Sequence, residues 1–125
     1  MKIALLGVGQ AGGKVADAIL EYEAASRVDF VTDAIGINSA RADLLGLERI
    51  PVDKRVLIGQ SRVKGHGCGA DNELGVTVAE EDLDEVRGAI DDLPVHEVDA
   101  FLVLAGLGGG TGSGAAPVIA RELAR

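Results

Sequence analysis

Two glycine-rich segments have the spacing that would let main-chain amides surround an anionic group. GVGQAGGK, residues 7–14, follows the apolar run KIALL, and AGLGGGTGSGAAP, residues 105–117, follows VDAFLVL. Glycine permits tight turns and lets a phosphate approach the backbone N–H groups closely. If a helix begins at each segment, the partial positive charge of its N-terminus adds to the attraction. The two segments therefore indicate phosphate binding by backbone amides.

The first segment matches a known spacing without completing either of the standard nucleotide motifs. Gly7, Gly9 and Gly12 satisfy G-x-G-x-x-G, which points first to a dinucleotide site. Such a site needs an acidic residue for the ribose at the end of the second strand, and Asn38 stands there. A Walker A loop needs Ser or Thr after its lysine, whereas Lys14 precedes a valine. The first segment alone does not identify its ligand.

The second segment changes the interpretation, because one glycine loop normally suffices for a diphosphate. Two strand–glycine–helix units at neighbouring strand ends would direct two helix dipoles at one crevice. A third phosphate would account for the second loop, and Thr111 and Ser113 add hydroxyl donors. The alternative is structural: a glycine turn that only lets a helix pack closely on the sheet.

A third glycine-rich segment, GHGCGADNE at residues 65–73, follows a further apolar run. It could reach a terminal phosphate, with Asp71 near a bound cation. Asp71 is equally suited to capping a helix, and both roles can hold together. His66 and Cys68 suggest zinc, but a structural zinc site needs four ligands and the only other histidine, His96, lies outside the segment. We expect His66 and Cys68 to be mobile loop residues.

The elements that must position these loops follow from the apolar pattern. Near-continuous apolar runs predict parallel strands buried on both faces; they are Lys2–Leu6, Phe30–Ile37, Arg55–Ile58 and Val98–Ala105. Helices are expected at about residues 11–23 and 40–46. The order of elements predicts a doubly wound α/β fold with a mostly parallel open sheet.

Two later helical regions carry local signals. Residues 71–93 are expected to form one helix or two, with Thr77 and Glu80 resembling a capping box inside them. A last helix is expected to begin near Ser113, which places Pro117 in its first turn. Because the fourth strand would be an exposed edge and the sequence stops within a helix, we expect the 125 residues to be either a fragment or a naturally short product of a longer ancestor.

Composition narrows the class of protein. At 125 residues the chain is one domain at most, and its net charge of −8 disfavours a nucleic-acid partner. A single cysteine excludes a disulfide within the chain and fits a cytoplasmic location. No apolar run reaches the roughly 18 residues of a transmembrane segment.

The motifs together resemble the tubulin superfamily. GGGTGSG, residues 108–114, is identical to the superfamily signature, and the following AAPVIA resembles the bacterial relative FtsZ. GVGQAGGK combines features of tubulin and FtsZ. VLIGQSRVKGHGCGADNELG, residues 56–75, is very similar to the third loop region of the CetZ family, tubulin-like cytoskeletal proteins of salt-loving archaea. The resemblance covers the whole chain. It implies that residues 1–125 are the N-terminal part of a Rossmann-like GTP-binding domain, truncated after about four strands.

The resemblance also implies a ligand and a set of residues. The ligand is GTP or GDP with Mg²⁺; Gln10 and Asp71 lie near the cation, through water if not directly, and Lys14 lies nearer the nucleoside. The nucleotide-binding residues are Gly9, Gln10, Ala11, Gly12, Gly13, Lys14, Asn38, Gly69, Ala70, Asp71, Asn72, Gly108, Gly109, Gly110, Thr111, Gly112, Ser113 and Gly114, with Asp43 a looser match. No catalytic residue is expected, because family members use acidic residues from a later loop of the next subunit.

The leading hypothesis is therefore a nucleotide-binding piece of a GTPase whose parent protein polymerises head to tail and controls cell shape. We expect the isolated chain to bind GTP weakly and not to hydrolyse it. A fragment of an NAD-dependent Rossmann oxidoreductase is the alternative enzyme class, and Asn38 and GGGTGSG argue against it. A structural or interaction module that binds no nucleotide is the third hypothesis.

Overall fold

A four-stranded parallel sheet forms the middle layer of the computed structural model, which describes residues 1–124. The strands lie in the order β3-β2-β1-β4, and every pair of neighbours is parallel. Their bounds are β1 (Ile3–Val8), β2 (Val31–Asn38), β3 (Arg55–Leu57) and β4 (Ala100–Ala105). The sequence prediction of an open parallel sheet of four strands is confirmed.

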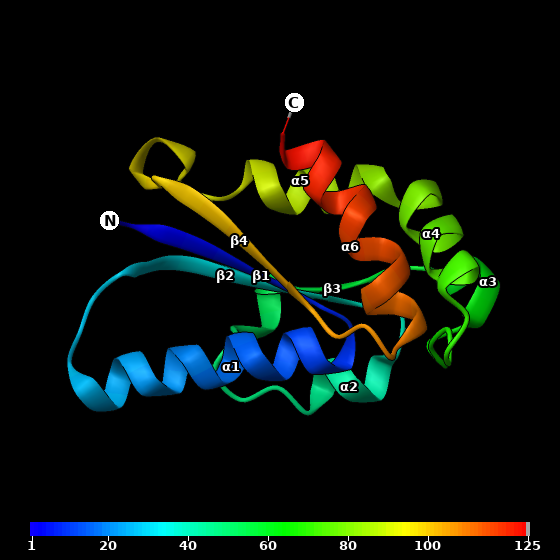
Figure 1. Ribbon diagram of the computed structural model, residues 1–125, viewed down its shortest axis with the longest axis horizontal. Helices are drawn as coiled ribbons and strands as arrows, with labels where there is room; N and C mark the ends of the chain where they lie inside the picture. The colour runs from blue at the N-terminus through cyan, green and yellow to red at the C-terminus, as the bar shows by residue number, and fades with distance from the viewer. Residues whose placement is uncertain (125) are drawn as a thin grey trace.

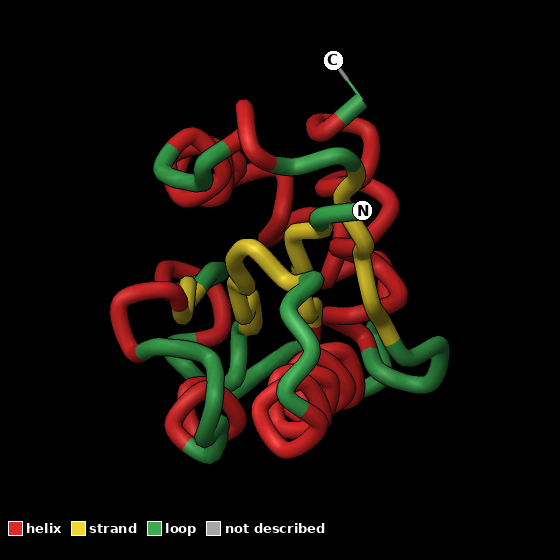
Figure 2. The backbone as a smooth tube through the Cα atoms, turned by 90° about the vertical axis from the view of Figure 1, so that its left-hand side faces the viewer, coloured by secondary structure: helices red, strands yellow, loops and turns green. Residues whose placement is uncertain are grey.

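Helices cover both faces of this sheet (Figures 1 and 2). One face carries α1 (Gly9–Ser26) and α2 (Arg41–Leu45), and the other carries α4 (Asn72–Glu81), α5 (Leu83–Asp91) and α6 (Gly110–Leu123). Short elements connect them: η1 (Val52–Lys54), α3 (Gln60–Val63) and η2 (Val95–Glu97). The arrangement is the doubly wound fold that the order of elements predicts.

The apolar runs are near-continuous because each strand supplies side chains to two separate cores. Along β1, Leu5 belongs to the cluster under α1 and α2, whereas its neighbours Leu6 and Ala4 belong to the cluster under α4, α5 and α6. Successive side chains of a strand point to opposite faces, so a strand covered on both faces must be apolar at every position. Leu5, Leu6 and Ile35 have no exposed surface.

The strand order reverses between β1 and β4. From β1 the chain passes to β2 on one side, and the later crossover brings β4 to the other side of β1. The carboxyl ends of β1 and β4 then lead directly into α1 and α6, which lie on opposite faces of the sheet. A crevice must form where the chain leaves a sheet in two opposite directions, and open α/β folds bind their ligands at such a point.

Two predictions about helix boundaries are wrong. Thr77 does not begin a helix: it lies inside α4, where its hydroxyl donates to the carbonyl of Glu73, and the break falls at Asp82. Asp82 ends α4 because its carboxylate accepts the N–H of Gly59 in the preceding loop. Residues 71–93 are therefore two helices.

The last helix begins three residues earlier than predicted. Gly109 is its N-cap and Gly110 its first residue, so Pro117 lies inside α6 rather than in its first turn. The amide of Gly110 donates to the carbonyl of Gly69 at 2.7 Å. This tertiary bond fixes the first turn of α6 before Ser113 is reached, which a local sequence signal cannot anticipate.

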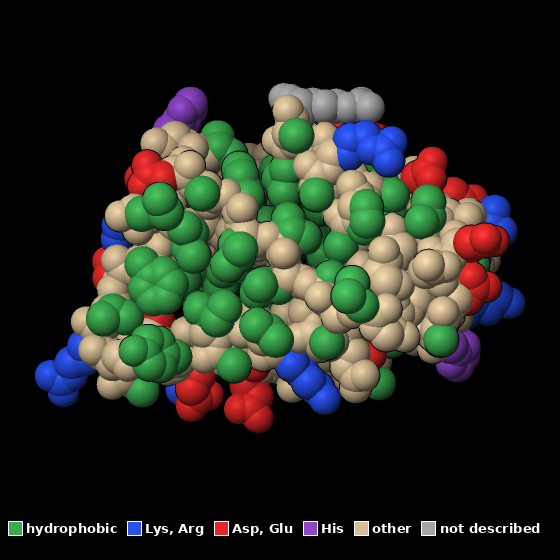
Figure 3. All heavy atoms as spheres, in the orientation of Figure 1, with side chains coloured by type: hydrophobic (Ala, Val, Ile, Leu, Met, Phe, Trp, Pro, Cys, Tyr) green, Lys and Arg blue, Asp and Glu red, His purple; other side chains and the backbone are tan. Residues whose placement is uncertain are grey.

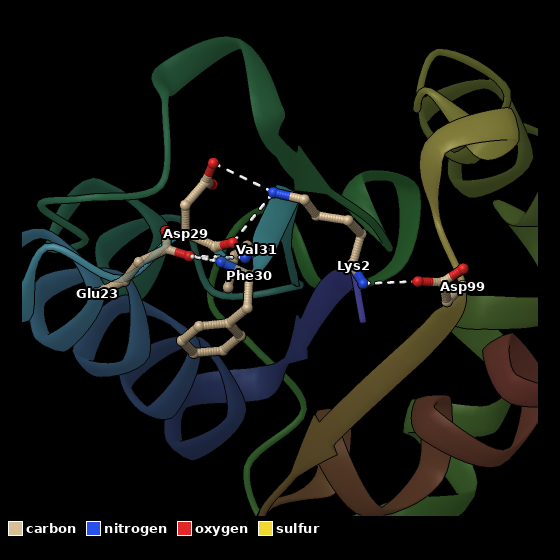
Figure 4. Close-up of polar contacts among 6 residues, drawn as sticks. All are labelled: Lys2, Glu23, Asp29, Phe30, Val31 and Asp99. Atoms are coloured by element: carbon tan, nitrogen blue, oxygen red, sulfur yellow. Dashed lines mark hydrogen bonds and ion pairs between the residues drawn. The ribbon is translucent and has the colours of Figure 1, made fainter.

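Carboxylates organise the end of the sheet opposite the crevice (Figure 4). Glu23 of α1 accepts the backbone N–H groups of Phe30 and Val31, at 2.8 and 2.6 Å, and so fixes the start of β2. Asp99 accepts the N–H of Lys2 at 2.7 Å, and the ammonium of Lys2 lies 3.1 Å from the carboxylate of Asp29. These acidic residues serve the fold.

One face of the molecule carries a concentration of apolar side chains (Figure 3). A hollow of about 360 Å³ lies there between α1 and the edge strand β4. Its lining includes Val15, Tyr22 and Leu102, each more than 40% exposed.

Among the described residues, no helix is both long enough and apolar enough to span a bilayer.

Candidate phosphate-binding site

The first turns of α1 and α6 are in direct contact at the carboxyl ends of β1 and β4. Gly9 has a φ of +78°, which lets the chain turn from β1 into α1 within one residue. A Cβ atom on Gly9 would lie 2.8 Å from the backbone nitrogen of Gly112, and one on Gly112 would lie 3.1 Å from the carbonyl oxygen of Val8. The two helix N-termini can approach this closely only because both residues are glycine.

A cavity of about 230 Å³ opens where the three glycine segments and the end of β2 converge. It is lined by Gly9, Gln10, Asn38, Ala40, Asp43, His66, Gly67, Cys68, Gly69, Gly109, Gly110, Thr111 and Gly112. A second hollow of about 180 Å³ shares four of these residues, namely Gly9, Gln10, Gly109 and Gly112, and adds Val8, Ala11, Gly106 and Gly108. The two hollows form one trough across both helix N-termini, and we call them together the trough.

The first-turn amides of both helices are the donors available in the trough. Among the described residues, the N–H groups of Gln10 and Ala11 have no acceptor, and neither do those of Thr111 and Gly112. The N–H of Gly110 is different, because it is already bonded to Gly69. With two helix dipoles directed at the same place, the trough favours an anion although the protein is acidic overall.

The glycines around the trough divide into two groups. A Cβ atom on Gly12 would lie 2.1 Å from the carbonyl oxygen of Leu104, and one on Gly114 would lie 2.1 Å from that of Asn72. These glycines, like Gly110, are required by close packing within the protein. Gly108 and Gly109 have nothing within 4 Å of a Cβ position, so packing does not explain them. Close packing within the protein therefore accounts for Gly12, Gly110 and Gly114, as it does for Gly9 and Gly112, but not for Gly108 and Gly109.

The trough includes ten of the eighteen predicted nucleotide-binding residues. The other eight do not line it: Gly12, Gly13, Lys14, Ala70, Asp71, Asn72, Ser113 and Gly114. Ser113 was expected to offer a hydroxyl donor, but that hydroxyl is bonded to the carbonyl of Gly109. Asp71 caps α4 by accepting the N–H of Leu74 through Oδ1 at 3.1 Å, as its capping interpretation predicts.

Asn38 is the last residue of β2 and shapes the wall of the trough. Its side chain is 3% exposed, and its Oδ1 accepts the N–H groups of Ser39 and Ala40, at 2.8 and 3.1 Å. Its amide nitrogen donates to Asp43 at 3.4 Å. Asn38 therefore holds the turn that follows β2.

Sequence reasoning missed part of the wall. Ala40 and Gly67 line the trough, and Ser39 lies buried behind it. Cys68 was expected in a mobile loop, but it is buried in the core cluster and its Sγ lies 3.3 Å from the hydroxyl of Ser39. The adjacent polar pair Asn38–Ser39 at the end of an apolar run was the signal that could have located this wall.

Comparison with known proteins agrees with this geometry. Residues 2–125 match the family model described as the Tubulin/FtsZ family, GTPase domain. The chain is 67% identical over its whole length to the tubulin-like protein CetZ1 of Haloferax volcanii, of which it covers 32%. It therefore spans about a third of the length of that curated relative.

Solved structures give the same result. The chain superposes on CetZ1 of Haloferax volcanii, described as a GDP-bound monomer, with a TM-score of 0.98 and 67% identity, covering 100% of this chain and 38% of that one. CetZ2 of the same organism, described as a GTPγS-bound protofilament, gives a TM-score of 0.92 and 50% identity. The match covers 99% of this chain and 36% of that one. FtsZ of M. jannaschii gives a TM-score of 0.74 and 31% identity, and the match covers 95% of this chain and 31% of that one.

Proposed function

Because this chain belongs to the Tubulin/FtsZ family, within its GTPase domain, we propose that it binds GTP and GDP by their phosphates in the trough. The observation that carries the proposal is the pair of helix N-termini that meet at Gly9 and Gly112 with free first-turn amides. Gly108 and Gly109 border open space, as a closely approaching phosphate requires. The descriptions of CetZ1 with GDP and CetZ2 with GTPγS support guanine nucleotides as the ligands.

Each part of the trough has a separate role in this proposal. The amides of α1 and α6 bind the phosphate oxygens, and the extended shape of the trough leaves room for more than one phosphate. Gly69 and its neighbours close the end of the cavity near Cys68, where the terminal phosphate lies. Lys14 is exposed and does not line the trough, and we propose that it lies nearer the nucleoside.

Magnesium fits this site. Mg²⁺ is commonly held by one or two protein oxygen atoms and by the phosphates of its nucleotide. Gln10 lines the trough, and Asp71, which does not, has an Oδ2 atom without a hydrogen-bond partner among the described residues. We assign Gln10 and Asp71 to the cation, Asp71 through water, and the ion would offset the phosphate charge.

For the whole protein we propose a GTPase that assembles head to tail into polymers and controls cell shape in the cytoplasm. The protofilament of CetZ2 supports the assembly. In the family that the chain resembles, acidic residues from a later loop of the next subunit complete hydrolysis, so we expect no rapid hydrolysis by the 125-residue chain alone. Rapid GTP turnover by that chain would contradict this part of the proposal.

Thermal unfolding with competing ligands tests the binding proposal. The melting temperature of the chain should rise with GTP or GDP in the presence of Mg²⁺ and change less with ATP or NAD, because only a ligand that binds the folded state stabilises it. A rise with NAD alone would favour the oxidoreductase hypothesis. No rise with any nucleotide would favour a structural module.

A further inference from the structure

A buried hydroxyl behind the trough connects the three chain segments that form its wall. Ser39 follows β2 and has no exposed surface, and it does not line the cavity. Its Oγ lies 2.6 Å from the hydroxyl of Thr111 in α6 and 3.3 Å from the Sγ of Cys68 in the third glycine segment. Both of these partners do line the cavity.

The backbone of Ser39 also connects the end of β2 to the third glycine segment. Its carbonyl accepts the N–H of Gly67 at 3.1 Å, and its own N–H donates to the Oδ1 of Asn38 at 2.8 Å. A single residue thus joins the end of β2, the third glycine segment and the first turn of α6. These segments are far apart in the sequence, and backbone bonds from Gly110 to Gly69 and from Arg41 to Gly65 also join them.

The three side-chain groups satisfy one another at a largely buried position between the cavity and the core. Thr111 and Cys68 are each 6% exposed, and the only buried side-chain polar atom without a partner in the described chain belongs to Thr32, elsewhere in the sheet. Removing the Ser39 hydroxyl would leave the hydroxyl of Thr111 without this partner inside the protein. An unpaired buried polar group is unfavourable, so the segments would separate or rearrange.

We infer that Ser39 is a positioning residue for the phosphate-binding trough. It acts through Thr111 and Cys68 and sets the affinity for the anionic end of a nucleotide without touching it. This inference rests on the proposed function, since it concerns the same trough.

The experiment uses the single cysteine as a reporter, because the chain has no other thiol. Ser39→Ala removes one end of the bond, and Thr111→Val removes the other while keeping the side-chain shape. Thr111→Ser restores the hydroxyl, and Thr77→Val is a matched control that removes a hydroxyl from α4 outside the trough. Circular dichroism and the melting temperature establish that each variant is folded.

Two quantities are measured: the rate at which iodoacetamide modifies Cys68 in the ligand-free chain, and the dissociation constant for GDP. Loss of one hydrogen bond should raise both by about three- to tenfold in Ser39→Ala and in Thr111→Val. The double variant should change no more than Ser39→Ala alone, because Thr111→Val removes a bond that Ser39→Ala already removes. Thr77→Val should remain close to the wild type, and Thr111→Ser should bind GDP more tightly than Thr111→Val because it keeps the hydroxyl.

The outcomes separate this inference from the function on which it rests. If the wild-type chain does not bind GDP, the proposed function is wrong, and the thiol rates alone show whether Ser39 joins the segments. If the wild type binds GDP and Ser39→Ala binds it equally well, Ser39 is not a positioning residue. Additive effects of the two variants, or a Thr111→Ser variant as weak as Thr111→Val, would also overturn the inference.

Discussion

At the residue scale, Asp17 shows how this acidic chain uses a carboxylate away from the trough. Asp17 lies on α1 and accepts the backbone N–H groups of Glu48, Arg49 and Ile50, at 2.9, 2.6 and 2.9 Å. Partial burial acts to raise the pKa of Asp17, but the three N–H donors together outweigh it and hold the pKa below its ordinary value of 3.8. The loop before η1 is thus anchored to α1 by one ionised side chain.

The lowered pKa of Asp17 predicts a pH dependence of stability. A carboxyl that ionises more readily in the folded state stabilises it above the ordinary pKa, and this contribution is lost as the pH falls through the lowered value. Asp17→Asn should reduce the free energy of unfolding by about 1–2 kcal/mol at neutral pH. The difference in the free energy of unfolding between the variant and the wild type should shrink below about pH 4. Urea unfolding measured at a series of pH values tests this.

Asp53 supplies the control for this comparison. Its side chain is exposed and has no hydrogen bond or ion pair in the described chain. Asp53→Asn should therefore leave the dependence of the free energy of unfolding on acidic pH unchanged. An Asp17→Asn variant whose curve runs parallel to the wild type at every pH would show that the three N–H bonds do not depend on the charge.

At the element scale, the trough depends on how closely α4 and α6 pack. A Cβ atom on Gly75 of α4 would lie 2.0 Å from the carbonyl oxygen of Gly110, and one on Gly114 would be equally close to the backbone of Asn72. Glycine on both helices lets the two backbones touch, which holds the first turn of α6 at the end of the third glycine segment. Within GGGTGSG, Gly110 and Gly114 therefore position a helix, whereas Gly108 and Gly109 border open space.

Gly114→Ala should lower the free energy of unfolding by about 1–3 kcal/mol, because the added methyl group would force α4 and α6 apart. Gly88 in α5 has nothing within 4 Å of a Cβ position, so Gly88→Ala should raise stability by about 0.5–1 kcal/mol. Chemical denaturation of both variants measures the two opposite changes. If both variants changed the free energy of unfolding equally, the close contact at Gly114 would not control how α4 and α6 pack.

The elements differ in how far the sequence could predict them. β1, β2 and β4 were predictable because a strand covered on both faces leaves a continuous apolar run. The boundary at Asp82 and the start of α6 at Gly110 were not, since a bond to Gly59 and a bond from Gly110 to Gly69 decide them. Such tertiary bonds join residues far apart in the sequence and leave no periodic signal.

The same distinction applies to the site. The glycine segments predicted the trough and its place at two helix N-termini, but they did not distinguish Gly109, which borders open space, from Gly114, which packs on α4. Ser39 and Cys68 escaped prediction because their role arises only when three distant segments meet. The spacing of residues identifies donors for a ligand and does not reveal what supports them.

At the scale of the whole molecule, a net charge of −8 is carried by a fold that we propose to bind a polyanion. Like charges over the surface repel one another and destabilise the compact state, and dissolved salt shortens the range of this repulsion. The helix N-termini supply the attraction locally, so the overall charge and the site do not have to agree in sign.

This charge predicts a salt dependence. The melting temperature should rise by several degrees when KCl is raised from about 0.1 M to about 1 M, because the screening length falls from about 10 Å to about 3 Å. Glu80→Lys, on the exposed side of α4, should shrink the rise, since it removes part of the repulsion. A melting temperature that falls with salt would show that attractive ion pairs outweigh the repulsion.

The most direct test of the nucleotide site is GDP binding by a Gly109→Val variant. Gly109 has an extended backbone, with a φ of −93°, and open space around its Cβ position, so valine should fit without loss of stability. Isothermal titration in Mg²⁺ should give a dissociation constant at least about tenfold higher than that of the wild type, because the side chain occupies the path of the phosphates. An unchanged melting temperature with this loss is the result predicted here. An unchanged GDP affinity in the folded variant would contradict the placement of the phosphates in the trough.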